Sequence, residues 1–505
     1  MNLHFFEWPA GYPLHNALAG TENLSGWQFL YSPLRSLGAS VGAAYNTALL
    51  ASIVISGIGT AAFSRRLGAS QFGALVGGFA FAFNPFHVDH MIHLQTMAIC
   101  WSPFALMGLD MALERSSPIA LSLLGVSFVM TMLCGMYFGV FLAMVLVLYP
   151  IIVWITRRFT FSFAILRDLT LTAVVCAVVL SPVLVHYFEF ARAYGAYPHS
   201  GEELALSSVP IVGLIQVPVW LASGGHFFPF RGDVGRFASA FPGLVVFAAV
   251  SCALLLAKTR SQREIVGTLM VLGFLCWLLS LGPTVEWRLG DPSRLLTSLP
   301  LPGKLWLAVS AIRWPMRIFM YTILCFALLA GLGTTWLMEK ISEAPRRFAQ
   351  VALLSLMYLE LRPSGWFAQQ SAAVVDPMRM SDAYPFLAGE TDRGGVVELP
   401  SRIDSGLVTP FAARYAYASA GHLRKVVSFH GSMFPPVADS LRMATYDLPA
   451  PDAILMMRSH GVTRLVIHKD LMSRDSSNYL VAAFLHDGDR VVFDGARSTV
   501  FSLIR

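Results

Sequence analysis

Residues 42–64 read GAAYNTALLASIVISGIGTAAFS, an uncharged stretch that ends directly before Arg65 and Arg66. A helix needs roughly 20 apolar residues to cross a bilayer, so this stretch predicts a transmembrane span. Other windows of this kind lie at 72–86, 96–113, 119–134, 137–155, 169–187, 242–257, 265–281, 318–337 and 349–361. The pattern predicts a polytopic α-helical membrane protein with about ten transmembrane helices.

Composition points to the same class. The chain of 505 residues is 55% hydrophobic and 13% charged, with a mean hydropathy of +0.60, which is unlike a soluble globular domain. When the windows alternate in direction, most arginines and lysines between them fall on one side, which the positive-inside rule assigns to the cytoplasm. Both termini are then extracytoplasmic. The net charge of +6 therefore reflects topology, and no basic stripe with interleaved aromatics predicts a nucleic-acid partner.

The chain divides into three regions by character. Residues 1–41 are predicted to form an extracytoplasmic first loop, and residues 42–361 a transmembrane domain with outer loops at 189–241 and 282–317. Residues 362–505 have ordinary soluble composition and predict an extracytoplasmic mixed α/β domain. Its expected strands are 395–399, 425–429, 463–468 and a hairpin of 490–493 with 498–504, and its expected helices include 437–446 and 452–459.

A cluster of polar side chains interrupts the apolar pattern between residues 82 and 103. His87, His90 and His93 recur every third residue, with Asp89 among them and Gln95 just beyond. Polar groups at a membrane boundary are costly unless they are paired or hydrated, so the cluster is a candidate site. Three interpretations stay open: a metal site, a water-facing site for substrate or proton transfer, and ordinary interfacial histidines.

Two arginines flank a proline on the side that the positive-inside rule leaves poor in cations. Arg313 and Arg317 stand just before the window at 318–337. Paired guanidinium groups at a membrane surface suit a phosphate or pyrophosphate, which accepts bidentate hydrogen bonds. The alternatives are snorkelling toward lipid headgroups and pairing with Glu286 and Asp291.

Two weaker candidates complete the set. Tyr137 lies in a turn between two glycines, Gly135 and Gly139, where helix packing is the simpler explanation. Glu202 lies in a loop and offers a carboxylate, although a solvated loop acid is the commoner explanation. The sequence has no nucleophile elbow, phosphate-binding glycine loop, dinucleotide fingerprint or HExxH zinc motif.

Several short motifs together resemble the GT-C superfamily of integral membrane glycosyltransferases. The resemblance runs through nearly the whole chain, at 8–11, 44–46, Asn84-Pro85 with His90 and His93, 101–103, 137–139, 312–317, His422, 429–431 and 461–468. It implies transfer of a sugar from a polyprenyl-phosphate-linked donor to a glycan or protein acceptor. It also implies contact with membrane lipid, a bacterial inner (plasma) membrane location and a role in the cell envelope.

The resemblance assigns expected roles to the candidate residues. Arg313 and Arg317 are expected to bind the phosphate, with Gln95 and Tyr137 in the same substrate-binding site. Asp89, His90 and His93 are expected to form the catalytic wall, with Glu202 as a further acid. No metal ligands are assigned. A divalent cation is the one cofactor that the family leaves open.

The sequence departs from the family in its first loop. The family places an essential aspartate there, after an initial helix, whereas this sequence opens beyond that point with Glu7 and Glu22 as the acids of the loop. We therefore expect either an N-terminal truncation or a chain that lacks the catalytic acid and is inactive as given. The alternatives to an enzyme are a lipid-linked saccharide transporter or export accessory, and a non-catalytic membrane scaffold.

Overall fold

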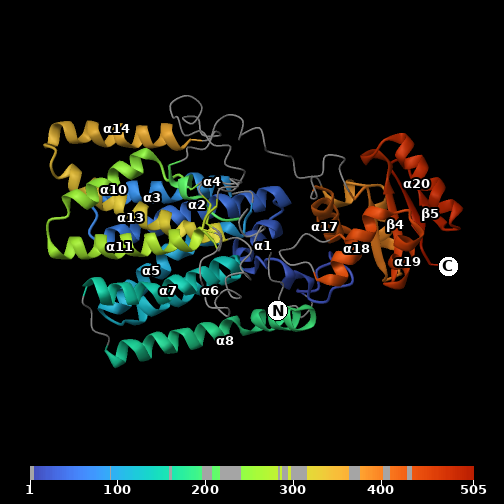
Figure 1. Cartoon of the computed structure of the whole chain (residues 1–505), viewed down its shortest axis with the longest axis horizontal. Helices are drawn as coiled ribbons and strands as arrows, with labels where there is room; N and C mark the ends of the chain where they lie inside the picture. Colours follow the sequence, from blue (N-terminus) through green and yellow to red (C-terminus); the bar gives the residue numbers. More distant parts are fainter. Residues whose placement is uncertain are drawn as a thin grey trace. The chain divides into compact units, whose positions relative to one another are not determined.

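The computed structural model forms two compact units (Figure 1). The first, here called the bundle, comprises Leu24–Ser181 and Pro198–Ala372, and the second, the α/β domain, comprises Met1–Asn23, Pro182–Tyr197 and Ala373–Arg505. The structure describes residues 5–90, 93–157, 162–195, 207–215, 240–282, 285–286, 294–296, 315–362, 376–401, 410–428 and 435–504. The fold class is the predicted one, a polytopic helical membrane protein with a mixed α/β domain.

The predicted apolar windows fall on helical segments. The helices of the bundle are α1 (Gln28–Ser36), α2 (Val41–Arg66), α3 (Gln71–Ala82), α4 (Pro85–Asp89), α5 (Ser102–Glu114), α6 (Pro118–Cys134), α7 (Met136–Arg157), α8 (Phe163–Tyr194, whose last residues belong to the α/β domain), α10 (Leu244–Leu256), α11 (Arg260–Ser280), α13 (Phe319–Met338) and α14 (Glu343–Leu361). Short 3₁₀ helices are η2 (Ser25–Trp27), η3 (Thr96–Trp101), η4 (Ile211–Leu214) and η5 (Pro315–Ile318), and strands β1 (Val285–Glu286) and β2 (Arg294–Leu296) pair antiparallel. The window at 72–86 covers α3 and the start of α4, and the window at 96–113 covers η3 and α5. Six helical segments of the described chain are long and apolar enough to cross a membrane, and α3, α6 and α10 are shorter apolar helices.

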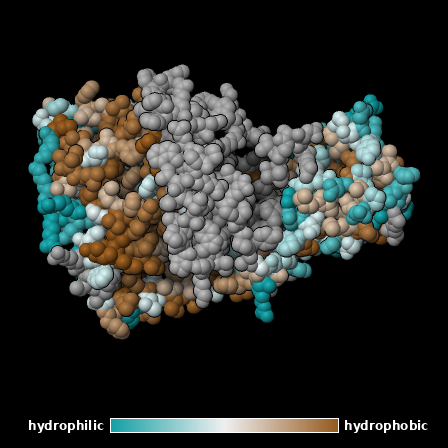
Figure 2. Space-filling view, in the orientation of Figure 1, coloured by the Kyte–Doolittle hydropathy of each residue, from teal (hydrophilic) through white to brown (hydrophobic). Residues whose placement is uncertain are grey.

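The bundle is apolar outside and partly polar inside, as a bilayer environment requires. On α2, Leu50, Val54 and Ile58 are exposed, whereas Ser52 and Thr60 are fully buried. Small and hydroxylated residues let membrane helices approach closely, while the larger apolar residues face lipid. Figure 2 shows hydrophobic residues gathered over the bundle and a mixed, more hydrophilic surface over the α/β domain.

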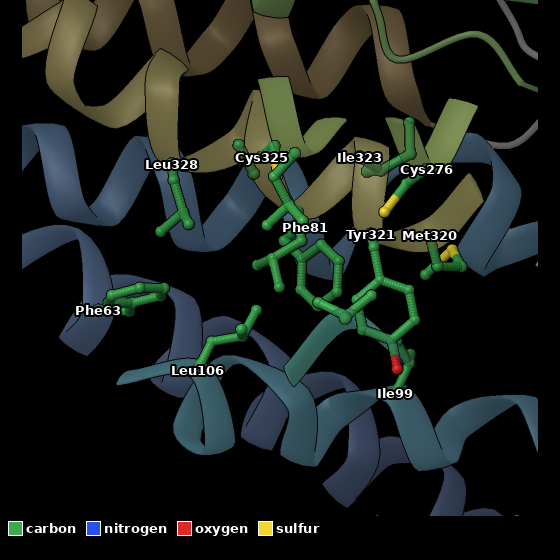
Figure 3. Packing of buried hydrophobic residues seen from close by; sticks show 14 of the residues in the cluster. Phe63, Phe81, Ile99, Leu106, Cys276, Met320, Tyr321, Ile323, Cys325 and Leu328 are labelled. Carbon is green, nitrogen blue, oxygen red and sulfur yellow. The ribbon is translucent and has the colours of Figure 1, made fainter. Parts of the chain in front are cut away.

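Helix α13 is the centre of the bundle. It packs against α3, α10 and α11, and 94% of its most apolar window is buried, compared with 17% for α8. Figure 3 shows Tyr321 and Leu328 of α13 packed among side chains of neighbouring helices, including Phe81. Glycines permit the close contact: a Cβ on Gly77 of α3 would lie 2.8 Å from a backbone oxygen of α13. All six cysteines are free thiols within helices of the bundle or at their ends.

One end of the bundle is joined by buried charges. The Asp110 carboxylate of α5 lies 2.8 Å from Arg66 Nε of α2 and 3.0 Å from an Arg157 guanidinium nitrogen of α7. Tyr149 donates a third hydrogen bond to it at 2.8 Å. This cluster connects three helices, and it lies near the end of α5 that is farther along the chain from His93.

The α/β domain contains a four-stranded sheet in the order β3-β4-β6-β5. Strands β3 (Gly395–Leu399) and β4 (Val462–His468) are parallel, and β6 (Ser498–Ser502) pairs antiparallel with β4 and with β5 (Arg490–Asp494). The hairpin of β5 and β6 is the predicted one. The helical elements here are η1 (Ala17–Gly20), η6 (Pro377–Arg379), α16 (Ala383–Gly389), α17 (Pro410–His422), α18 (Pro436–Asp447), α19 (Pro451–Ser459), η7 (Lys469–Leu471) and α20 (Arg474–His486).

The N-terminal segment belongs to this sheet. Val426 forms parallel bridges with Val396 of β3 on one side and with Ala10 on the other. Tyr12 donates its backbone N–H to the Val426 carbonyl at 2.9 Å, and its hydroxyl donates to the Gly461 carbonyl at 3.2 Å. The strand predicted at 425–429 is therefore an isolated bridge, with residue 429 outside the described part. Residues 5–23 fold with the α/β domain, whereas the sequence predicted a separate loop over 1–41.

Helix α8 also differs from its prediction. The outer loop expected from residue 189 begins later, because the helix continues to Tyr194. Its polar last turns contact the N-terminal segment: Asn16 Nδ2 donates to Glu189 at 3.0 Å, and His15 N donates to Tyr194 at 3.0 Å. These partners let charged residues extend a helix that began as an apolar span. Most of the two predicted outer loops lies outside the described residues.

Candidate functional site

The segment that carries His87, His90 and His93, here called the histidine turn, begins at a helix N-terminus that the sequence specifies. Asn84 accepts the His87 N–H with its side chain at 2.8 Å, and Pro85 occupies the first helical position. Asparagine at the N-cap followed by proline is a favoured way to begin a helix. Helix α4 then ends at Asp89, so His90 is at its C-cap and His93 lies beyond it. The three histidines therefore do not share one helix, although they recur every third residue.

Phe86 holds the His90 imidazole. The two rings stack with centroids 4.1 Å apart and an angle of 16° between their planes, and His90 Nδ1 lies 2.9 Å from the Phe86 carbonyl oxygen. Because a carbonyl oxygen only accepts hydrogen bonds, this contact assigns the hydrogen to Nδ1. Nε2 is then the basic nitrogen of the neutral ring.

Arg317 lies beside this imidazole. Burial is the main reason that the pKa of His90 lies well below its usual range, and the positive charge of Arg317 lowers it further. The Arg317 residue is 7% exposed, and its guanidinium carbon Cζ lies 5.6 Å from the centre of the Tyr137 ring. The structure thus brings together three residues predicted for one site, one each from the histidine turn, the start of α7 and η5.

Glycine sets the position of the turn that carries Tyr137. A Cβ on Gly135 would overlap the carbonyl oxygen of Gln95 and lie 3.0 Å from the Ala98 side chain. The turn between α6 and α7 therefore rests directly on the backbone of the histidine turn. On its other side, a Cβ on Gly26 of η2 would come within 2.8 Å of the Cys134 nitrogen. Gln95 is half-buried at this junction.

His87 and His93 have different surroundings. His87 is buried, with Nδ1 3.4 Å from the Phe81 carbonyl oxygen and Nε2 3.1 Å from the Met97 sulfur. Burial lowers the pKa of His87 to about 4, so it is neutral. His93 is half-buried and donates its backbone N–H to the His90 carbonyl at 2.9 Å. Within the part of the chain that the structure describes, no group of three or more His, Cys, Asp and Glu side chains is arranged to hold a metal ion.

Three of the predicted site residues have no described side chain. Arg313 and Glu202 lie outside the described residues, and of Asp89 only the backbone is described. Sequence reasoning missed Phe86 and Thr96, which hold the turn. The spacing of Phe86 four residues before His90 was the available signal, because residues at this spacing meet on a helix.

Known proteins resemble this chain in structure alone. No protein family matches this sequence, and no curated protein matches it. Among solved structures, the chain is similar to ArnT from Cupriavidus metallidurans bound to undecaprenyl phosphate, with a TM-score of 0.47 and 13% identity, over 95% of this chain and 87% of that one. It is also similar to the apo state of that protein, with a TM-score of 0.44 and 12% identity over the same shares of the two chains.

Proposed function

We propose that this chain is a membrane glycosyltransferase that moves a sugar from a polyprenyl-phosphate carrier to an extracytoplasmic acceptor. The observation that carries the proposal is the neutral His90 imidazole held beside the buried Arg317 guanidinium at one end of an apolar bundle. A lipid-linked phosphate needs two environments, an apolar surface for its chain and a cation for its headgroup.

Glycosyl transfer needs a group that stabilises negative charge on the leaving phosphate and a group that takes the proton of the acceptor hydroxyl. The acceptor oxygen bonds to the anomeric carbon while the bond from that carbon to the phosphate oxygen breaks, and the electron pair leaves with the phosphate. Arg317 is proposed to stabilise this developing charge, because a fixed guanidinium in a water-poor site needs little reorganisation. His90 is proposed to take the acceptor proton at Nε2, which requires the neutral ring that burial and Arg317 favour.

Tyr137 supports the cation in this proposal. An aromatic face within about 6 Å of a guanidinium attracts it, by about 2 kcal/mol where both groups are desolvated. Tyr137 is thus proposed to orient Arg317 toward the phosphate. Gln95, next to this turn, is proposed to contact the sugar, while Arg313, Asp89, His93 and Glu202 keep the roles expected from the sequence.

Lipid binding tests the phosphate role before any sugar is identified. The full chain in detergent micelles is titrated with a synthetic polyprenyl phosphate and, separately, with the matching polyprenol, and the thermal midpoint is followed. We expect the phosphate to raise the midpoint and the alcohol not to. Arg317→Ala should weaken the apparent affinity by about 100-fold, as for a buried charge-assisted contact worth about 3 kcal/mol. Arg35→Ala, which removes an exposed arginine of α1, is the matched control.

Transfer is measured with labelled polyprenyl-phosphate sugars in liposomes that contain the protein. Label in a glycan or protein acceptor, lost in Arg317→Ala and kept in Arg35→Ala, supports the enzyme. Label that crosses the bilayer still attached to its carrier would instead identify a transporter. Equal stabilisation by the phosphate and by the alcohol would remove Arg317 from the proposed site.

A further inference from the structure

Thr96 follows the histidines in the chain, and its side chain contacts the backbone carbonyls of His90 and His93. Its Oγ1 is 2.9 Å from the His90 carbonyl oxygen and 2.7 Å from that of His93. The Thr96 backbone N–H also donates to the His93 carbonyl at 2.9 Å. The residue is buried, and it begins η3, which leads into the apolar helix α5.

This hydroxyl adds side-chain contacts to the backbone hydrogen bonds of the same residues. One hydroxyl hydrogen is shared between two carbonyl oxygens that lie three residues apart in the chain. The backbone also bonds here, from His93 N to the His90 carbonyl and from Thr96 N to the His93 carbonyl, each at 2.9 Å. Phe86 stacks on the His90 ring, so the backbone and the ring of His90 are each held by a separate contact.

We infer that Thr96 is a positioning residue, whose hydroxyl holds the backbone of His90 and so fixes where the imidazole lies near Arg317. The expected effect of Thr96 on catalysis rests on the proposed function, whereas its expected effect on the position of His90 does not. Thr96 touches neither the substrate nor the reacting atoms. A valine has nearly the same shape and lacks the hydroxyl, so Thr96→Val isolates the hydroxyl, and Thr96→Ser restores it.

The burial of His90 and the charges around it make its titration sensitive to the position of the ring. The groups that act on it are Arg317, His87 and His93, and Arg317 has the largest effect of the three. If the turn relaxes, His90 moves away from the cation and becomes more hydrated, and both changes favour the protonated ring. The pKa of His90 therefore rises in Thr96→Val and stays low in Thr96→Ser.

The experiment titrates His90 in the full chain by NMR with ¹⁵N-labelled histidine, using His90→Gln to assign its signal. We expect protonation of His90 to begin at a higher pH in Thr96→Val than in the wild type, and Thr96→Ser to match the wild type. An unchanged titration in Thr96→Val, or an equal shift in both variants, overturns the inference. A shift confined to Thr96→Val supports it even if no sugar transfer is detected, and in that case the proposed function is what fails.

With an active preparation, turnover gives a second readout. Thr96→Val should lower kcat by about 10-fold and move the acid limb of the kcat profile to higher pH, since the neutral ring is lost sooner as the pH falls. Thr96→Ser should keep kcat within about threefold of the wild type. Binding of polyprenyl phosphate should change little in either variant, because Arg317 is untouched. Equal loss of kcat in both variants would show that turnover does not depend on the hydroxyl specifically, because Thr96→Ser retains it, and this result overturns the inference.

Discussion

The buried carboxylate of Glu398 should be the most sensitive single group in the α/β domain. It lies on β3, where one of its oxygens is 2.7 Å from His468 Nε2 of β4 and accepts a hydrogen bond from the Tyr384 hydroxyl at 2.9 Å. The side chains of Glu398 and His468 are 0% and 1% exposed. Hydrogen bonds to a charged group contribute about 1.5–3 kcal/mol each, so the two together account for about 3–6 kcal/mol.

Glu398→Ala removes both contacts and leaves an imidazole and a phenol buried without this partner. We expect a loss of about 3–5 kcal/mol, because two buried polar groups each lose their partner, at about 1–3 kcal/mol apiece. Glu398→Gln keeps the shape and one acceptor oxygen, so it should cost about 1–2 kcal/mol. Asp447→Ala, which removes an exposed carboxylate of α18, should change stability by less than about 0.5 kcal/mol.

Hydrogen exchange of β3 and β4 amides in the full chain measures this effect without isolating the domain. A loss of about 3–5 kcal/mol lowers the protection of those amides by about 100- to 4,000-fold. Exchange in the bundle helices should not change, since the two units are separately compact. If Glu398→Gln loses as much protection as Glu398→Ala, the acceptor oxygen and the shape that glutamine retains contribute nothing, and the reasoning from two separate hydrogen bonds is wrong.

Two further substitutions test the bundle. Asp110→Ala leaves the Arg66 and Arg157 guanidinium groups without their shared carboxylate, and should lower the free energy of unfolding by about 3 kcal/mol, measured by thermal unfolding in micelles. An unchanged midpoint would show that the cluster contributes no net stability. Gly333→Ala places a methyl group against the α10 backbone, 2.7 Å from one of its nitrogens, and should destabilise the bundle by about 1–3 kcal/mol. Gly267→Ala, where a Cβ meets no atom within 4 Å, should be neutral or stabilising, and equal effects of the two changes would refute the packing argument.

Hydropathy predicted which segments are helices but not which of them are buried. The windows on α8 and α13 are similarly apolar, yet α13 is the centre of the bundle and α8 lies at its edge. Hydropathy measures the free energy of moving a side chain out of water. It does not distinguish a helix that faces lipid from one that is buried among other helices, because lipid tails and leucine side chains are equally apolar. The distinction lies in the small residues of α13, such as Gly331 and Gly333, which permit close contact with α3 and α10.

Local patterns predicted the strands, but not the pairing of distant segments. The runs at Gly395–Leu399 and Val462–His468 are largely apolar and buried, so they were recognisable as central strands. The bridge of Ala10 to Val426 joins segments from opposite ends of the chain, and neither has a long alternating pattern. The extension of α8 to Tyr194 was missed for the same reason, since its polar last turns depend on partners such as Asn16.

The residue types of the proposed site stand out in the sequence, whereas their arrangement is only partly predictable from it. Intramembrane polarity singled out His90 and Arg317 separately, and topology placed them at the same end of the bundle, where the structure finds them together. Hydropathy does not predict the contacts that hold His90 in place. These are the stacking of Phe86 on its ring and the hydrogen bonds of the Thr96 hydroxyl to the carbonyls of His90 and His93. Both are ordinary residues in sequence, because a phenylalanine and a threonine are common in any apolar window. Helix α4 ends at Asp89 with His90 at its C-cap, so the spacing of the three histidines is not that of a single helix.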